Sequence, residues 1–316
     1  MNTKILVLGA GAIGGYFGGR LVEAGQDVTF LVRLNRKKQI EGNGGIVVIN
    51  SVNGNYTFKP TLITKEEGDG NVEYDVVLLS SKSYHLQASI EDLKPFIGKN
   101  TLVIPLLNGI QHISILEQAF GRERVLGGLC VVETTLNDKG EIHQPSELNQ
   151  LIFGQLDGGT TEKLNQLAQA FGSTKAKFTL SESITQDMWN KYLMITTMSS
   201  ITTLMRTPLG TIRDSVGGLE FIESVFKETE SIMRANGAPL SDGIVDRYMT
   251  LVKTISSQFK TSMQRDMEKG LEIEGDHIQG YILQLAKQHN ISAPLLRCAY
   301  QNLCVYNEML KARSNQ

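Results

Sequence analysis

The sequence predicts an α/β fold in which a doubly wound parallel sheet is followed by a second, all-helical domain. Apolar runs typical of strands alternate with helical stretches in the first half of the chain, and strand patterns stop near residue 183. Helical patterns fill the remainder. Alternating strands and helices are typical of a parallel sheet with helices on both faces. We therefore expect two domains, residues 1–182 and 183–316, close to the usual size of about 150 residues each.

The first element is an apolar run that leads directly into a glycine motif. Residues 4–14 read K-I-L-V-L-G-A-G-A-I-G. A short apolar run ended by glycine predicts a buried parallel strand. Residues 12–23 then predict a helix and residues 27–32 a second strand. Together they form a β-α-β unit of the expected length, about 30 residues.

The glycines of this motif predict a dinucleotide-binding turn. Gly9 permits a tight turn, Gly11 lets a pyrophosphate approach the backbone, and Gly14 lets the helix pack against the strand. Ala12 and Ile13 begin the helix, whose free N–H groups and positive dipole end attract phosphate. The alternative is a glycine-rich turn in another α/β protein, because a chain with 31 glycines can produce the motif by chance.

The end of the second strand predicts the choice of cofactor. NAD-binding chains usually carry a carboxylate there for the ribose 2′-hydroxyl, whereas this chain has Arg33. A guanidinium suits a 2′-phosphate, and Arg36, Lys37 and Lys38 add positive potential. We therefore predict NADPH rather than NADH. The alternative is that Arg33 is only a solvated loop residue.

The remaining elements follow from the same patterns. The turn at Asn53-Gly54 predicts a hairpin that decorates the sheet. Its strands are expected at residues 46–50 and 56–59, and further strands of the parallel sheet at residues 74–80, 101–107, 124–135 and 151–154. Helices of the second domain are expected at residues 183–204, 220–236, 244–254, 274–289 and 294–311.

Composition excludes several classes of function. The chain is 41% hydrophobic and 20% charged, with a net charge of −2. It therefore has no overall basic field for nucleic acid or an anionic membrane. No segment approaches the ~20 apolar residues that span a bilayer, and glycines interrupt the first apolar run, which argues against a signal peptide. We expect a cytoplasmic protein that binds neither nucleic acid nor membrane.

Cysteine and histidine usage predicts neither disulfides nor a metal site. Cys130, Cys298 and Cys304 lie in apolar stretches without metal-ligand spacing. We interpret them as buried thiols in a reducing compartment. The five histidines form no H-x-x-x-H pattern, so no metal is expected.

Polar residues lie where chemistry is expected. Ligands of an open α/β sheet bind beyond the carboxyl ends of the strands, where Lys82 and Asn108 follow two predicted strands. Lys191 lies in an apolar helical stretch beside the single tryptophan, and Ser262 and Glu274 lie in a later charged segment. Taken alone, Lys82, Asn108 and Lys191 are each more typical of a solvated loop or helix face than of a functional site. The charged segment with Ser262 and Glu274 is also typical of a solvated helix face.

Taken together, these patterns resemble the ketopantoate reductase (2-dehydropantoate 2-reductase) family over essentially the whole chain. The motifs are G-x-G-x-x-G with Arg33, K-S at residues 82–83, L-N-G at 107–109, W-x-K at 189–191, T-S-M-x-x-D-x-x-x-G at 261–270 and E-x-D at 274–276.

The resemblance implies NADPH-dependent reduction of 2-dehydropantoate, a 2-oxo acid, to D-pantoate in pantothenate and coenzyme A biosynthesis. It implies Lys191 as the general acid that protonates the carbonyl oxygen, with Glu274 interacting with that lysine and the substrate. A lysine ammonium stabilises the developing oxyanion, and an adjacent carboxylate keeps it protonated. The implied binding residues are Ser262, Asn108 and Ser199 for the substrate, and Arg33, Lys82, Asn108 and Glu274 for the cofactor.

Three positions depart from the family pattern. Asparagines usually follow the catalytic lysine by four and eight residues, on the same helix face, but here these positions are Ile195 and Ser199. The arginine common after the glycine of the later motif is also absent, since Leu271 follows Gly270. A substrate hydroxyl buried against Ile195 without a partner costs roughly 1–3 kcal/mol.

Three alternatives therefore stay open beside 2-dehydropantoate reduction, in which Ser199 or Thr202 would replace the missing amides. The substrate is a less polar, branched 2-oxo acid; the chain is a NADPH-binding sensor without catalysis; or it belongs to the imine reductase or 3-hydroxy acid class of enzymes. The oligomeric state, monomer or homodimer, is also open.

Overall fold

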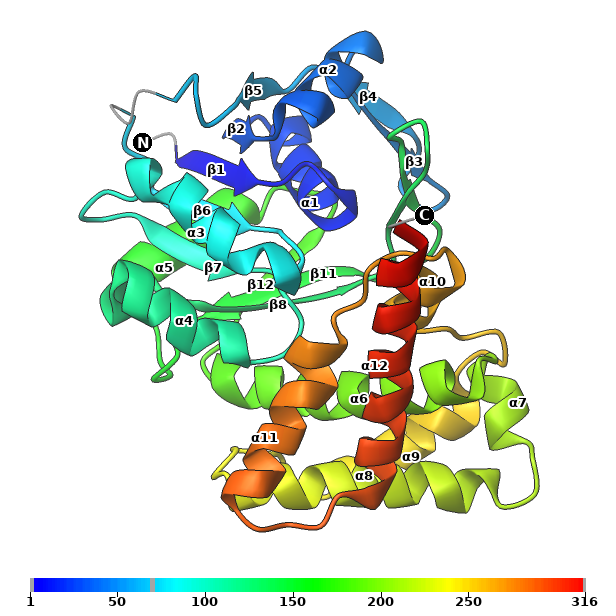
Figure 1. The fold of residues 1–316 in the computed structure, drawn as a ribbon. Coiled ribbons are helices and arrows are strands. Elements are labelled where there is room, and N and C mark those ends of the chain that lie inside the picture. Colours follow the sequence, from blue (N-terminus) through cyan, green and yellow to red (C-terminus); the bar gives the residue numbers. More distant parts are fainter. Residues whose placement is uncertain (1–2, 69–71, 315–316) are drawn as a thin grey trace. The chain divides into compact units, whose positions relative to one another are not determined.

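The computed structural model describes residues 3–68 and 72–314. The chain divides into two compact units. The first consists of Met1–Leu107 and His112–Thr185, and the second of Asn108–Gln111 and Gln186–Gln316. The first unit contains parallel strands and helices and the second contains helices (Figure 1), which confirms the predicted fold class.

The first unit is built around a five-stranded parallel sheet with the order β5-β2-β1-β6-β7 (Figure 1). The chain builds outward from β1 to one side and then returns to its other side at β6, so the topological switch point lies between β1 and β6. The strands are β1 (Lys4–Leu8), β2 (Asp27–Leu31), β5 (Thr61–Ile63), β6 (Val76–Leu79) and β7 (Leu102–Pro105).

Alternate side chains of these strands enter two different apolar clusters. Ile5 and Val7 of β1 pack in one cluster, whereas Leu6 and Leu8 pack in another. Because side chains alternate across a strand, both faces of the sheet are covered, as the uninterrupted apolar runs require. The helical segments of this unit are α1 (Ala12–Glu23), α2 (Leu34–Gly42), η1 (Ser83–His85), α3 (Leu86–Leu93), η2 (Lys94–Phe96), α4 (Gln111–Phe120), η3 (Arg122–Arg124) and α5 (Glu162–Phe171).

Two predicted strands lie outside the parallel sheet, so that part of the prediction is wrong. β8 (Gly127–Val132) and β11 (Asn149–Gly154) pair antiparallel in a separate sheet with β12 (Lys177–Leu180). A parallel connection needs a crossover, usually a helix, and no helix lies between β8 and β11. The chain returns in the opposite direction instead.

The predicted hairpin forms, but in a sheet of its own. β3 (Ile46–Asn50) and β4 (Tyr56–Phe58) pair antiparallel. β9 (Thr135–Leu136) and β10 (Ile142–Gln144), which had no clear sequence signal, complete a sheet with the order β4-β3-β10-β9. The pairing of β3 with β10 joins segments far apart in the chain, which local pattern cannot predict.

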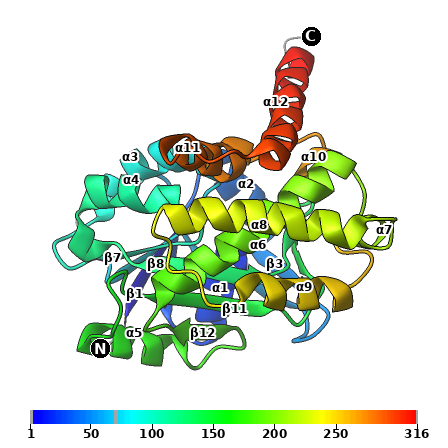
Figure 2. The same cartoon turned by 90° about the horizontal axis from the view of Figure 1, so that it is seen from below.

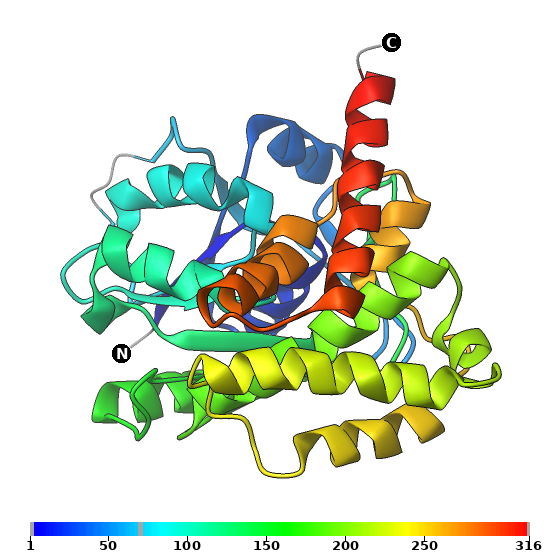
Figure 3. The ribbon, with the colours of Figure 1, turned by 60° about the horizontal axis from the view of Figure 1, so that its bottom comes forward.

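The second unit is a helical assembly around α6 (Figures 2 and 3). Buried serine and threonine hydroxyls on α6 donate to carbonyls four residues earlier, as in Ser199 to Ile195 and Thr202 to Met198, which satisfies them inside the core. The helices are α6 (Ile184–Met205), α7 (Leu209–Arg213), α8 (Gly218–Ala235), α9 (Ile244–Thr254), α10 (Ser262–Glu268), the π-helical turn η4 (Asp276–Gly280), α11 (Tyr281–Gln288) and α12 (Pro294–Ser314).

The cysteine prediction holds for one residue of three. Cys130 is buried, but Cys304 is only half-buried and Cys298 is exposed. Both lie on α12, where Leu296 and Leu303 occupy the inward face. Helical periodicity therefore turns Cys298 outward, although its sequence neighbours are apolar. Within the described part of the chain, no helix is both long and apolar enough to cross a membrane.

Candidate functional site

A cavity of about 480 Å³ lies in the first unit where β1, β2 and β6 end. Its lining includes four residues predicted to bind the cofactor, Gly9, Gly11, Arg33 and Lys82. Lys82 follows β6 and precedes η1. Parallel strands end at one edge of a sheet, so the topology explains why the four meet.

The motif glycines have different spatial roles. Gly9 has φ +96°, and a Cβ there would lie 2.6 Å from the carbonyl oxygen of Ser80. A Cβ on Gly14 would lie 2.1 Å from the carbonyl oxygen of Gly9. A Cβ on Gly11 would meet nothing within 4 Å. Gly9 and Gly14 are thus required by the fold itself, whereas Gly11 leaves space open beside the N-terminus of α1.

We predict that alanine substitutions separate these roles. Gly14→Ala should destabilise the protein by about 1–3 kcal/mol, because the new methyl group overlaps the backbone. Gly11→Ala should leave stability nearly unchanged and weaken NADPH binding, because its methyl group enters the open space where the glycine motif predicts pyrophosphate. Thermal unfolding and fluorescence titration with NADPH measure the two effects. Equal loss of stability in both variants would contradict this division.

The basic residues after β2 divide between exposed and structural roles. Arg33 is exposed, and within residues 3–68 and 72–314 no hydrogen bond or ion pair engages its guanidinium. Arg36 donates from Nε to the carbonyl oxygen of Ala10 at 3.0 Å and also binds Gly140, and burial lowers its pKa. Lys37 pairs with Glu67. Arg36 therefore holds the glycine turn, a role that the sequence did not reveal, whereas Arg33 stays exposed.

The second unit contains a polar cluster around Lys191. The Nζ atom of Lys191 donates to Oδ1 of Asn108 at 3.0 Å, and both residues are half-buried. The backbone carbonyl of Asn108 accepts from Nε2 of His277 at 2.9 Å. Two residues predicted independently, 83 positions apart, are thus in direct contact.

Two further contacts attach α6 to the segment after Glu274. The buried hydroxyl of Tyr192 donates to the carbonyl oxygen of Ile278 at 2.7 Å, and burial raises its pKa far above the ordinary value. Gln279, also fully buried, donates from Nε2 to Oγ of Ser199 at 2.7 Å. Glu274, half-buried, lies two residues before η4. Burial lowers the pKa of His277, and the charge of Glu274 opposes this shift. The helix bearing Lys191 and the π-helical turn therefore form one hydrogen-bonded body.

The two departures from the family pattern that lie on α6 differ in their surroundings. Ile195 is half-buried, with part of its apolar surface accessible. Ser199 is only 3% exposed, and its hydroxyl donates to Ile195 while accepting from Gln279. The hydroxyl hydrogen of Ser199 is therefore already donated within the protein, and its contact with substrate stays a prediction.

Ser262 lies at the first position of α10 and is exposed. The preceding residue, Thr261, caps the helix by accepting from the backbone N–H of Gln264 at 3.2 Å. The Thr261 hydroxyl also lies 3.0 Å from that of Thr202 on α6. This contact fixes the start of α10 against α6, leaving the hydroxyl of Ser262 at the surface.

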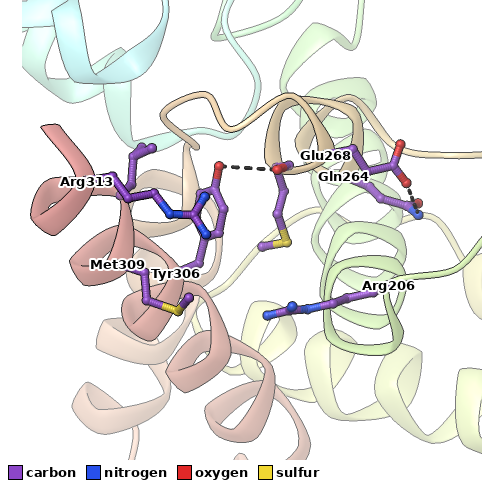
Figure 4. Close-up of a pocket in the computed structure, with 8 residues that line it drawn as sticks. Arg206, Gln264, Glu268, Tyr306, Met309 and Arg313 are labelled. Carbon is purple, nitrogen blue, oxygen red and sulfur yellow. Dashed lines mark hydrogen bonds between the residues drawn. The ribbon is translucent and has the colours of Figure 1, made fainter.

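A second cavity, of about 250 Å³, lies in the helical unit. None of the predicted catalytic residues lines it (Figure 4). Arg206 follows α6, and Gln264 of α10 donates to Glu268 at 3.2 Å. From Lys191 to the end of α6 is about 21 Å along the helix axis, at about 1.5 Å per residue. We therefore place the candidate chemistry at Lys191. No group of three or more His, Cys, Asp or Glu in the described ranges could hold a metal ion.

Four residues of these sites were not predicted from the sequence: Arg36 in its structural role, Tyr192, His277 and Gln279. His277 and Asn108 are 169 positions apart, and Gln279 has no motif partner in the sequence. Only the proximity of His277 to Glu274, one helical turn away, could have marked it as a candidate.

Comparison with known proteins bears directly on this arrangement. The family model described as Ketopantoate reductase PanE/ApbA matches residues 5–158, and the one described as Ketopantoate reductase PanE/ApbA C terminal matches residues 183–307. The resemblance inferred from the motifs is thereby confirmed over both parts of the chain.

Individual proteins agree with the family models. The chain is 42% identical over 303 residues to the Bacillus subtilis protein named Uncharacterized oxidoreductase YkpB, covering 96% of this chain and 98% of that protein. It is 25% identical over 297 residues to 2-dehydropantoate 2-reductase of Streptococcus pyogenes serotype M1, covering 93% and 94%. A structure of D-mandelate dehydrogenase with NADH and anilino(oxo)acetate has the same fold, with a TM-score of 0.86, 19% identity and coverage of 98% and 99%. Since the two family models match 5–158 and 183–307, this chain, an oxidoreductase, belongs to the ketopantoate reductase family.

Proposed function

We propose that this protein reduces a 2-oxo acid to the 2-hydroxy acid with NADPH, and that 2-dehydropantoate is its leading substrate, giving D-pantoate. The observation that carries the proposal is the 3.0 Å hydrogen bond from Lys191 Nζ to Asn108 Oδ1 in a half-buried cluster. A half-buried lysine held in a defined direction by a neutral amide is placed to donate to a substrate oxygen.

The cavity at the strand ends suits the cofactor. The space beside Gly11, the N-terminus of α1 and the exposed guanidinium of Arg33 match a pyrophosphate and a 2′-phosphate. When bound, NADPH supplies hydride. Lys82, which lines the same cavity, adds a cation beside the bound nucleotide.

Lys191 carries the proton transfer in this proposal. As negative charge develops on the substrate carbonyl oxygen, the Nζ ammonium stabilises it more in the transition state than in the ground state, and then donates a proton. Asn108 fixes the direction of the ammonium, and we assign Glu274 the role of keeping the lysine protonated. Ser262 offers an exposed hydroxyl for the substrate carboxylate.

The accessible apolar surface of Ile195 favours a second candidate, a branched 2-oxo acid less polar than 2-dehydropantoate. The family pattern has amides at these two positions. Ile195 has no side-chain donor, and the hydroxyl of Ser199 already donates to the carbonyl oxygen of Ile195. A substrate hydroxyl would therefore lose a partner there, at roughly 1–3 kcal/mol.

A matched substrate pair tests this choice. The acid 3,3-dimethyl-2-oxobutanoate is 2-dehydropantoate without its hydroxyl. NADPH oxidation followed by absorbance gives kcat/KM for both. We expect Ile195→Asn to shift the ratio toward 2-dehydropantoate by about tenfold, within the 1–3 kcal/mol range of an unpartnered polar group, whereas the control Ile195→Val leaves it unchanged. An unchanged ratio in Ile195→Asn would exclude this position as the specificity determinant. Tight NADPH binding by the native chain without turnover of any 2-oxo acid would favour a non-catalytic sensor.

A further inference from the structure

Three hydrogen bonds link the Lys191 cluster into a closed circuit, which is completed by residues that are adjacent in the sequence. Lys191 donates to the Asn108 side chain at 3.0 Å, and the Asn108 carbonyl accepts from His277 at 2.9 Å. Ile278, next to His277, accepts from Tyr192 at 2.7 Å, and Tyr192 adjoins Lys191. Asn108 is therefore held at both its backbone and its side chain.

We propose that His277 is a positioning residue, which holds Asn108 so that the Asn108 amide sets the direction of the Lys191 ammonium. The inference rests on the proposed function, because it gives the Lys191 direction a consequence for proton transfer. Misplacement of a reacting group by about 1 Å can cost 10²-fold in rate. A turn anchored at only one point would permit such a displacement.

The turn at Gly109 packs closely against the imidazole of His277. Gly109 has φ +85°, and a Cβ there would lie 3.2 Å from both Cδ2 and Nε2 of His277. The ring thus lies directly against the turn that carries Asn108. His277 itself comes from a π-helical turn, a local irregularity frequent at functional sites.

The hydrogen bond also defines the state of the imidazole. A carbonyl oxygen only accepts, so Nε2 carries the hydrogen and donates. Burial lowers the pKa of His277 below its ordinary value, while Glu274 and the hydrogen bond to Asn108 act in the opposite direction. The net lowering favours the neutral ring, which adds no second positive charge to the cluster.

Two amide substitutions at His277 test the proposal because they place an N–H differently. The amide nitrogen of His277→Gln is as many bonds from Cα as Nε2, whereas that of His277→Asn is one bond shorter. We expect His277→Gln to stay within about threefold of the native kcat and His277→Asn to lose about tenfold or more, with unchanged Kd for NADPH. His277→Phe, which keeps the ring volume without a donor, should match His277→Asn.

A double-mutant cycle shows whether His277 acts through Asn108. If it does, Asn108→Ala combined with His277→Asn loses no more kcat than Asn108→Ala alone. Additive losses, or native kcat in both His277→Asn and His277→Phe, overturn the proposal.

Hydrogen exchange measured by mass spectrometry provides a readout that does not depend on turnover. Peptides covering residues 105–113 should exchange faster in His277→Asn than in His277→Gln or the native protein. Unchanged exchange in His277→Asn shows that His277 does not hold the turn, and overturns the inference. Faster exchange in a protein that reduces no 2-oxo acid would instead contradict the proposed function and leave the anchoring role intact.

Discussion

Replacing Lys191 with alanine is expected to lower kcat by about 10²–10⁴-fold, the usual contribution of general acid catalysis, while Kd for NADPH stays unchanged. The reduced carbonyl oxygen would then lack both the ammonium that stabilises its charge and the donor of its proton. Single-turnover NADPH oxidation measures the chemical step, and fluorescence titration measures cofactor binding.

The structure supplies a matched control for this variant. Lys227 lies on the surface of α8 and pairs with Glu223, so Lys227→Ala removes the same charge from the same unit without touching the cluster. We expect native turnover from it. Native turnover in Lys191→Ala would remove this lysine from the mechanism, whereas an equal loss in both variants would indicate a general effect of charge or stability.

Replacing Arg33 with alanine should raise KM for NADPH by about 10–100-fold and leave KM for NADH nearly unchanged. A hydrogen bond to a charged group contributes about 1.5–3 kcal/mol, and only NADPH carries the 2′-phosphate that would use this guanidinium. The exposed position of Arg33 on the cavity wall makes its removal a local change. Steady-state kinetics with both cofactors give the comparison.

Neighbouring basic residues separate this effect from two others. Lys38 is exposed and does not line the cavity, so Lys38→Ala tests whether nearby charge alone matters. Arg36→Ala removes the clamp on Ala10 and should weaken both cofactors together. If Arg33→Ala raised KM for NADH as much as for NADPH, Arg33 would be only a solvated loop residue and the NADPH assignment would fail.

Local pattern predicted the bounds of elements whose ends are marked by nearby residues. The helix at residues 12–23 has the predicted bounds, because the glycine motif starts it and Gly25, with φ +80°, follows its end. The strand at residues 46–50 was also placed correctly. β8 and β11 were assigned to the wrong sheet because an apolar strand sequence does not specify which strand it pairs with. Their antiparallel pairing depends on the connection between them.

The candidate site also has features that local sequence predicts and features that depend on long-range packing. The sequence by itself determined the residue types that chemistry needs: glycines without side chains at a turn, a guanidinium after a strand, and a lysine in an apolar helix. Only the tertiary structure decided which of them act together. In the folded protein Arg33 is exposed, whereas Arg36 donates to the carbonyl oxygen of Ala10. Asn108 accepts from Lys191 through its side chain and from His277 through its backbone carbonyl. Spacing along a chain specifies helix faces and turns, but a hydrogen bond across 169 positions exists only once packing has brought its donor and acceptor within 3 Å of each other.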